Sequence, residues 1–233
     1  MNSKTYVDKL EKLFESNRNA PYAIRMKSYM RDQFDYYGIN SPLRKELLSS
    51  FLKENGKPSN EDLKQVVELL WKNDHREMQY VAMDIMGKMI RVLDDSYLLF
   101  LEKLILTKSW WDTVDWIAPT GIGHVFKKHP EHIKSITERW IQSENIWLQR
   151  SSIIFQLKYR EQTDFQLMSD YILYRADSKE FFVKKGSGWA LRQYSKYNAK
   201  AVIEFIKNHE DVLSNLTKKE GLKWMERVRK RIG

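Results

Sequence analysis

The sequence predicts an all-α protein in which pairs of helices stack on one another. Apolar residues recur with helical spacing along most of the chain, and no segment alternates apolar and polar residues for long, as a half-buried strand would. Only nine glycines and five prolines interrupt the 233 residues. A chain of this length can build one sizeable core, and no linker-like tract divides it. We therefore expect residues 1–233 to form a single domain.

Turn-forming residues mark the expected ends of about a dozen helices. Each expected break contains asparagine, aspartate, glycine or proline. The breaks are residues 17–21, 38–42, 55–60, 73–74, 129–130, 161–164 and 197–198.

An internal repeat organises most of the chain. Residues 77–83, 112–118, 147–153 and 182–188 align at a constant offset of 35 residues, which is typical of helix-pair solenoids. Upstream of the later three segments, apolar residues around Leu104, Ile136 and Tyr171 predict an outer helix before each inner helix. We therefore expect an all-α fold, an α-solenoid of HEAT-like helix pairs whose inner helices line a concave basic groove.

Serine residues precede the later inner helices. Ser109, Ser143 and Ser178 are expected N-caps, because a serine hydroxyl there accepts a hydrogen bond from the first turn. Asp112, three residues after Ser109, completes a sequence similar to a capping box. The glycine-containing triplets 121–123 and 186–188 fall inside expected inner helices, where close packing explains them better than phosphate binding.

One column of the repeat is polar in every unit and is formed by Tyr80, Asp115, Arg150 and Lys185. Equivalent positions on successive inner helices project into the same groove, so Asp115 and Arg150 are expected neighbours. A ladder of salt bridges between repeats and a binding surface explain this column equally well.

Tryptophans beside the column favour the binding surface. Trp111 lies one helical turn before Asp115, Trp189 lies one turn after Lys185, and Trp147 precedes Arg150 by three residues. Large aromatic side chains are hard to bury against a polar column that needs water or a polar ligand. The remaining tryptophans that we assign to core packing are Trp71, Trp116, Trp140 and Trp224.

Composition narrows the function classes. A net charge of +9 and an aromatic content of 13% favour a polyanionic partner, with nucleic acid first. The absence of cysteine excludes disulfides, thiol catalysis and cysteine-ligated metal sites, and the five histidines show no metal-binding spacing. Residues 1–9 are polar and no apolar run could span a membrane. We expect a cytoplasmic, nucleoid-associated protein that needs no cofactor.

A carboxylate at the centre of a basic site predicts a particular chemistry. Arg150, Lys184 and Lys185 can contact phosphates, and indoles can pack on a sugar or base. Asp115 would repel phosphate, so its presence indicates that positive charge must be stabilised there. Hydrolysis of an N-glycosidic bond develops an oxocarbenium-like sugar, which a carboxylate stabilises. A base made cationic by alkylation would leave without a general acid.

Three segments resemble the bacterial AlkD-type DNA alkylation-repair glycosylases. They are residues 107–115, 145–150 and 188–192, in the family's order, and the similarity covers nearly the whole chain. The resemblance implies a HEAT-like solenoid that removes cationic N3- and N7-alkylated purines from duplex DNA, without a metal and without base flipping.

The resemblance also implies roles for individual residues. Asp115 corresponds to the catalytic carboxylate, and Trp111 and Trp189 to the two tryptophans that contact the deoxyribose of the lesion. Arg150 corresponds to a phosphate-binding arginine and Tyr29 to a further DNA-contacting tyrosine. A monomer would suffice for such a site.

The alternative is a non-catalytic solenoid that binds DNA or a protein partner. Loss of Asp115 or of the tryptophan pair would mark that class, and all three residues are present.

Overall fold

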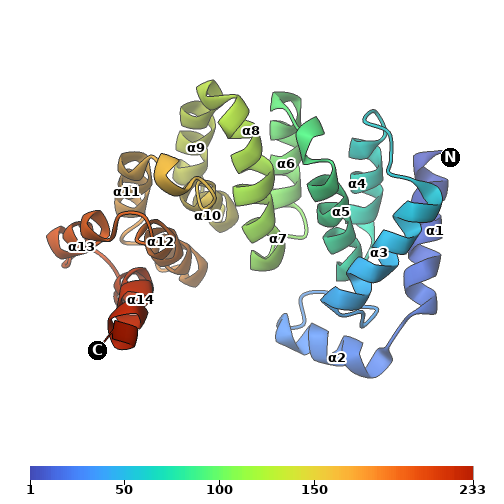
Figure 1. The fold of residues 1–233 in the computed structure, drawn as a ribbon, viewed down its shortest axis with the longest axis horizontal. Helices are drawn as coiled ribbons and strands as arrows, with labels where there is room; N and C mark the ends of the chain where they lie inside the picture. The colour runs from blue at the N-terminus through green and yellow to red at the C-terminus, as the bar shows by residue number, and fades with distance from the viewer. Residues whose placement is uncertain (233) are drawn as a thin grey trace. The chain divides into compact units, whose positions relative to one another are not determined.

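The computed structural model describes residues 1–232, with side chains up to Val228, and all regular elements in this range are helices (Figure 1). The prediction of an all-α protein is confirmed. The chain divides into two compact units, Met1–Leu93 and Asp94–Gly233. The expectation of a single domain over residues 1–233 stays a prediction.

The first unit contains five α-helices. They are α1 (Ser3–Ser16), α2 (Ala20–Tyr29), α3 (Ser41–Asn55), α4 (Leu63–Lys72) and α5 (Arg76–Lys88), followed by the short 3₁₀ helix η1 (Ile90–Val92). Helix α4 packs against α1 and α5, and α3 contacts α1 and α5. Their interior is apolar, with Leu10, Leu70 and Met78 fully buried.

Helix α2 differs from its neighbours because none of its residues is buried. The loop that follows it is fixed instead. The buried carboxylate of Glu77 accepts hydrogen bonds from the backbone N–H groups of Tyr37, Gly38 and Ile39. Gly38 has a φ of +86° and lies against the backbone of Asn19, where a Cβ atom would come within 2.0 Å of the Asn19 carbonyl oxygen. This clip holds the start of α2 and the loop after it to the unit.

The second unit repeats the pairing of outer and inner helices. Its α-helices are α6 (Leu98–Leu106), α7 (Trp111–Trp116), α8 (Gly123–Lys128), α9 (Ile133–Gln142), α10 (Ile146–Ile154), α11 (Phe165–Tyr174), α12 (Phe181–Tyr194), α13 (Ala199–Asn208) and α14 (Asn215–Ile232). Short 3₁₀ helices are η2 (Asp95–Tyr97), η4 (Pro130–His132) and η5 (Arg160–Gln162).

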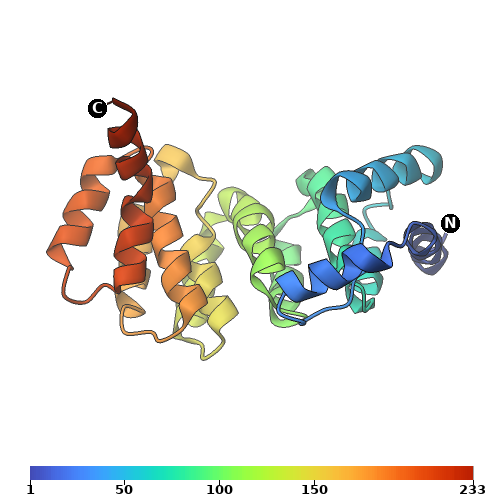
Figure 2. The same ribbon diagram turned by 90° about the horizontal axis from the view of Figure 1, so that it is seen from below.

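The inner helices of this unit contact one another in series. Helix α10 touches α7 and α12, and α12 packs along α14 (Figures 1 and 2). The outer helices α6, α9 and α11 coincide with the segments predicted around Leu104, Ile136 and Tyr171. Each of the seven predicted breaks contains a boundary between helices, so the turn-forming residues placed these ends correctly.

The inner segment around residues 111–128 is not a plain α-helix. A π-helix, η3 (Ile117–Ile122), joins α7 to α8. Pro119 lies within it and lacks the N–H group that an α-helical turn would use, and a wider turn is one way to accommodate this loss. The chain therefore remains helical from Trp111 to Lys128 despite a proline in its middle.

The predicted serine N-caps are wrong. The N-caps of α7, α10 and α12 are Trp110, Asn145 and Glu180, respectively. Ser109 donates to the carbonyl of Ile105 at the end of α6, and Ser143 and Ser178 each accept a bond from the N–H of the N-cap residue two positions later. Asp112 lies within the first turn of α7 and is not its N-cap. The serines thus shape the loops that precede the helices.

Gly188 sets the distance between α12 and α14. A Cβ atom there would lie 2.5 Å from Cβ of Glu220 and 2.8 Å from the carbonyl oxygen of Thr217. We expect Gly188→Ala to lower the free energy of unfolding by about 2 kcal/mol, because overpacking outweighs the reduced entropy of the unfolded chain.

Urea denaturation of the two variants Gly188→Ala and Gly121→Ala provides the measurement and its control. A Cβ at Gly121 would meet only the movable side chain of Leu101, at 3.3 Å, so we expect a change below about 1 kcal/mol. Equal midpoints for the two variants would contradict the tight approach of α14 to α12.

Candidate active site and nucleic-acid interface

Asp115 on α7 and Arg150 on α10 form a bidentate ion pair. Nε of Arg150 donates to Oδ1 of Asp115 at 2.7 Å, and Nη2 donates to Oδ2 at 2.8 Å. Both side chains are largely buried, with 4% of Arg150 and 18% of Asp115 exposed. The prediction that these residues are neighbours across adjacent repeats is confirmed. Two parallel charge-assisted bonds fix the plane of the carboxylate.

Arg150 is also bound to α12. Its Nη1 donates to the carbonyl of Phe182. A Cβ at Gly186 would lie 2.9 Å from the same Nη1, so glycine at this position makes room for the guanidinium. Arg150 therefore links three consecutive inner helices. This burial disagrees with the expected direct contact between Arg150 and a phosphate, because almost none of the side chain reaches solvent.

The environment of Asp115 acts on its pKa in opposite directions. Burial raises the pKa and outweighs the lowering by Arg150, while the nearby Asp112 raises it further, so the pKa of Asp115 lies above its ordinary value. The charge of this carboxylate in the folded protein thus depends on Arg150.

Two tryptophans lie near the ion pair. Trp111 is the first residue of α7, one turn before Asp115, and is partly exposed. Trp189 on α12 is partly exposed, and its ring centroid lies 5.8 Å from the guanidinium carbon of Arg150. The indole of Trp189 therefore lies beside the pair, and Trp111 lies on the same face of α7 as Asp115 by its spacing of four residues.

Trp147 does not border the groove as expected. It is 7% exposed and packs against Trp110 and Phe182, with ring centroids 5.7 Å and 5.0 Å apart. This aromatic cluster fastens the starts of α7, α10 and α12 together. The helical periodicity of the sequence predicted the face of α10 on which Trp147 lies. It could not predict that neighbouring aromatic side chains would cover that residue.

The tryptophans assigned to the core divide into two groups. Trp71 and Trp140 are buried, at 4% and 0% exposure, as predicted. Trp116 and Trp224 are partly exposed, so the prediction that they pack in the core holds only for the buried part of each side chain.

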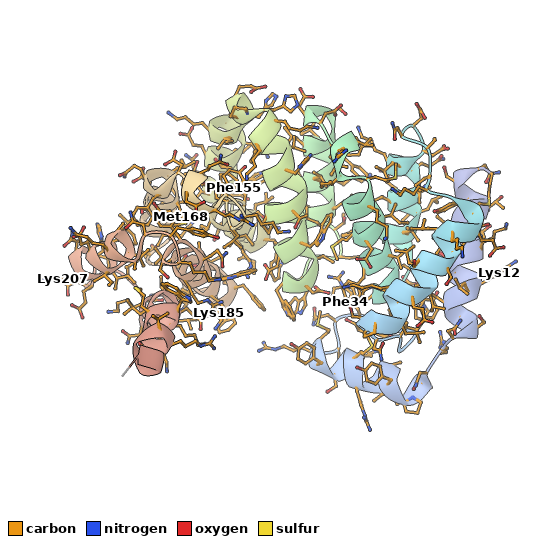
Figure 3. All side chains as sticks on the ribbon, in the orientation of Figure 1. Lys12, Phe34, Phe155, Met168, Lys185 and Lys207 are labelled. Carbon is orange, nitrogen blue, oxygen red and sulfur yellow. The ribbon has the colours of Figure 1, made fainter. Side chains whose placement is uncertain are left out.

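Lys185 is part of a charged cluster that lies beyond the aligned segments of the repeat, which end at residue 188. The buried carboxylate of Glu220 on α14 binds Lys185 at 2.9 Å, Arg192 at 2.8 Å and Lys223 at 2.6 Å. Figure 3 labels Lys185 on α12, near α14. Burial alone would raise the pKa of Glu220, but its hydrogen bonds to Lys223 and Lys185 and the charge of Arg192 lower that pKa to about 2. The carboxylate is therefore ionised at any pH at which the protein is assayed.

Lys184 and Tyr29 occupy different surroundings. Lys184 is partly exposed on α12, and its backbone carbonyl accepts a hydrogen bond from Thr217. Tyr29 ends α2 in the first unit and is 74% exposed.

The described part of the chain contains no group of three or more potential metal-ligating side chains. No helix in that part is both long enough and apolar enough to cross a bilayer.

Comparison with known proteins gives a family. Residues 10–225 match the family model described as DNA alkylation repair enzyme. A predicted DNA alkylation repair enzyme from Enterococcus faecalis is 34% identical, with a TM-score of 0.81 over 89% of this chain and 96% of that one. None of the curated proteins compared shows significant similarity.

Two further structures share the fold at lower identity. AlkD2 from Streptococcus mutans is 19% identical with a TM-score of 0.58, over 88% of this chain and 98% of that one. The protein smu.31 from Streptococcus mutans UA159 is 20% identical with a TM-score of 0.58, over 79% and 96% of the two chains. These two likenesses show the fold; the family match and the 34% identical Enterococcus faecalis protein show that the chain belongs to the DNA alkylation repair enzyme family.

Proposed function

We propose that this member of the DNA alkylation repair family is a DNA glycosylase. It hydrolyses the N-glycosidic bond of cationic N3- and N7-alkylated purines in duplex DNA. The observation that carries the proposal is the Asp115–Arg150 pair with Trp189 beside it and Trp111 one helical turn before Asp115. An ionised carboxylate held in a fixed plane near two indoles is suited to a cationic sugar, and it has no use in binding phosphate alone.

The reaction needs a cation stabiliser and a water molecule. The bond between C1′ and the alkylated nitrogen breaks, and its electron pair neutralises the positive base, which leaves unprotonated. Asp115 stabilises the oxocarbenium ion and positions the water whose oxygen bonds to C1′, while the water proton passes to solvent. The proposal includes neither a metal nor rotation of the base into a pocket.

The other groups bind the DNA around the reacting sugar. Trp111 and Trp189 contact the deoxyribose by CH–π and cation–π interactions. Lys184 and Lys185 contact phosphates, and Tyr29 makes a further contact to DNA. The buried Arg150 fixes the plane and charge of Asp115. We propose that the protein acts as a monomer in the cytoplasm, associated with the nucleoid.

Base release from methylated duplex DNA tests the proposal. The purified protein is expected to liberate 3-methyladenine or 7-methylguanine, measured by chromatography against a blank for spontaneous depurination. Binding should weaken steeply with salt because phosphates are neutralised. Salt-dependent binding without base release would favour the non-catalytic solenoid. An affinity that does not change with salt concentration would indicate a protein partner.

Removal of the Trp189 ring should slow the chemical step. We expect Trp189→Ala to lower the single-turnover rate of base release about tenfold, the equivalent of about 1.4 kcal/mol of lost cation–π and CH–π stabilisation. Trp189→Phe retains a ring and should stay within about threefold of the wild type. Tyr174→Ala, which removes a 54% exposed ring from the outer helix α11, is the control. Equal rates for Trp189→Ala and Tyr174→Ala would remove Trp189 from the site.

A further inference from the structure

A stripe of three side chains runs along α12. Lys185, Trp189 and Arg192 are spaced at i, i+4 and i+7, which places them on one face of the helix. The indole proposed to contact the sugar is therefore flanked on each side by a cation. Lys185 is 37% exposed and Arg192 is 27% exposed, so both charged groups remain accessible to a ligand.

One buried carboxylate holds both flanking cations. Oε1 of Glu220 accepts from Lys185 and Lys223, and Oε2 accepts from Arg192, while only 4% of the Glu220 side chain is exposed. Glu220 can reach the stripe because α14 lies close to α12 at Gly188, the residue before Trp189, where a Cβ atom would lie 2.5 Å from Cβ of Glu220. Its two oxygens thus fix the positions of both cations relative to the indole.

The charges of the cluster explain why a carboxylate between the cations is useful for positioning bound DNA. Three cations and one carboxylate leave the cluster with two positive charges, and the carboxylate removes the repulsion that would otherwise spread the cations apart. Long, flexible lysine and arginine side chains that are held in place present their charges at fixed positions relative to the indole, which serves the alignment of the bound sugar rather than the affinity for DNA.

We propose that Glu220 is a positioning residue, which holds Lys185 and Arg192 so that they bind the phosphates on either side of the damaged nucleotide while Trp189 contacts its sugar. The inference rests on the proposed glycosylase function. It assigns Glu220 an action through its partners, without contact to the DNA.

The variant Glu220→Gln distinguishes the positioning role of Glu220 from a purely structural role. The variant frees the cations, so its affinity for undamaged duplex should rise about threefold, and the slope of log affinity against log salt should steepen by about one, corresponding to one more neutralised phosphate. Its single-turnover rate at saturating protein should fall about tenfold, because the sugar is less well aligned with Asp115. Damage to the fold would lower affinity and turnover together.

Two further variants complete the test. Glu226→Gln makes the same charge change on an exposed residue of the same helix, and it should leave the turnover and the salt slope as in the wild type. Glu220→Asp keeps the charge on a shorter side chain, and it should give a turnover between those of Glu220→Gln and the wild type with an unchanged salt slope. If Glu220→Gln does not fold, the turnover and salt slope of Glu220→Asp test the inference in its place.

Unchanged turnover and salt slope in Glu220→Gln would overturn the inference, and so would a joint fall of affinity and turnover. If the wild type binds duplex DNA but releases no base, the proposed function fails. The salt slopes of Glu220→Gln and Glu226→Gln then decide alone whether Glu220 controls the phosphate contacts.

Discussion

Asp115→Asn is expected to lower the single-turnover rate of base release at least about 100-fold, a typical cost of removing one preorganised electrostatic group from a transition state. The amide has nearly the shape of the carboxylate but carries no charge to stabilise the oxocarbenium ion. Affinity for duplex DNA should stay within about threefold of the wild type, because Asp115 repels phosphate and adds nothing to binding in the ground state.

This variant also tests the fold, since Arg150 would remain 3% exposed with no anionic partner. We expect a loss of about 3 kcal/mol in the free energy of unfolding, because a buried charge left without its partner keeps its desolvation cost. The assay therefore requires circular dichroism at the assay temperature.

Asp112→Asn, three residues earlier on α7, is the matched control. It removes a neighbouring charge that raises the pKa of Asp115 and leaves the ion pair intact. Its turnover should equal that of the wild type. Undiminished turnover in a folded Asp115→Asn protein would remove the catalytic role of this carboxylate.

Arg150→Gln should change both stability and the pH profile. Base release needs the ionised form of Asp115, so the wild-type rate should fall as the pH drops through a pKa that lies above the ordinary aspartate range. Arg150 is the group that lowers this pKa, and its removal should move the acid limb to higher pH. Arg150→Lys keeps a charge without the bidentate geometry, and it should give a smaller displacement.

The stability of Arg150→Gln should depend on pH with a definite sign. A carboxyl group whose folded-state pKa is raised binds its proton more tightly in the folded protein than in the unfolded chain, so stability falls as the pH rises through the two pKa values. We expect a loss of about 3 to 4 kcal/mol at neutral pH, reduced at acidic pH where Asp115 is protonated. Urea denaturation at several pH values gives both quantities. An acid limb at the wild-type position would contradict the electrostatic coupling of the pair.

The 35-residue period was sufficient to predict the helix pairs and the meeting of Asp115 with Arg150. A repeat states which positions are equivalent, and equivalent positions on stacked helices face the same way. It does not state how much space surrounds them. The depth of Arg150 depends on Gly186, and the burial of Trp147 depends on Phe182, which lies 35 residues away on the next inner helix.

Glu220 was missed because the alignment of the repeat ended at residue 188, although Glu220 lies 35 residues after Lys185 and continues the same column. Two signals were available: the 35-residue column extended by one unit beyond Lys185, and the stripe of Lys185, Trp189 and Arg192, in which two cations flank an indole on one face. The serine N-caps failed for a local reason: the loops before the inner helices contain further extended residues, and the cap falls later in each loop.

Helix α2 shows how a protein can separate folding from surface chemistry. Because none of its residues is buried and the clip at Glu77 holds its start and the loop after it, its outward side chains contribute little to the core. Surface substitutions of this kind usually alter stability by less than about 0.5 kcal/mol. Selection or design can therefore change the exposed residues of α2 at little cost in stability, so functional changes that follow from such substitutions report mainly on recognition.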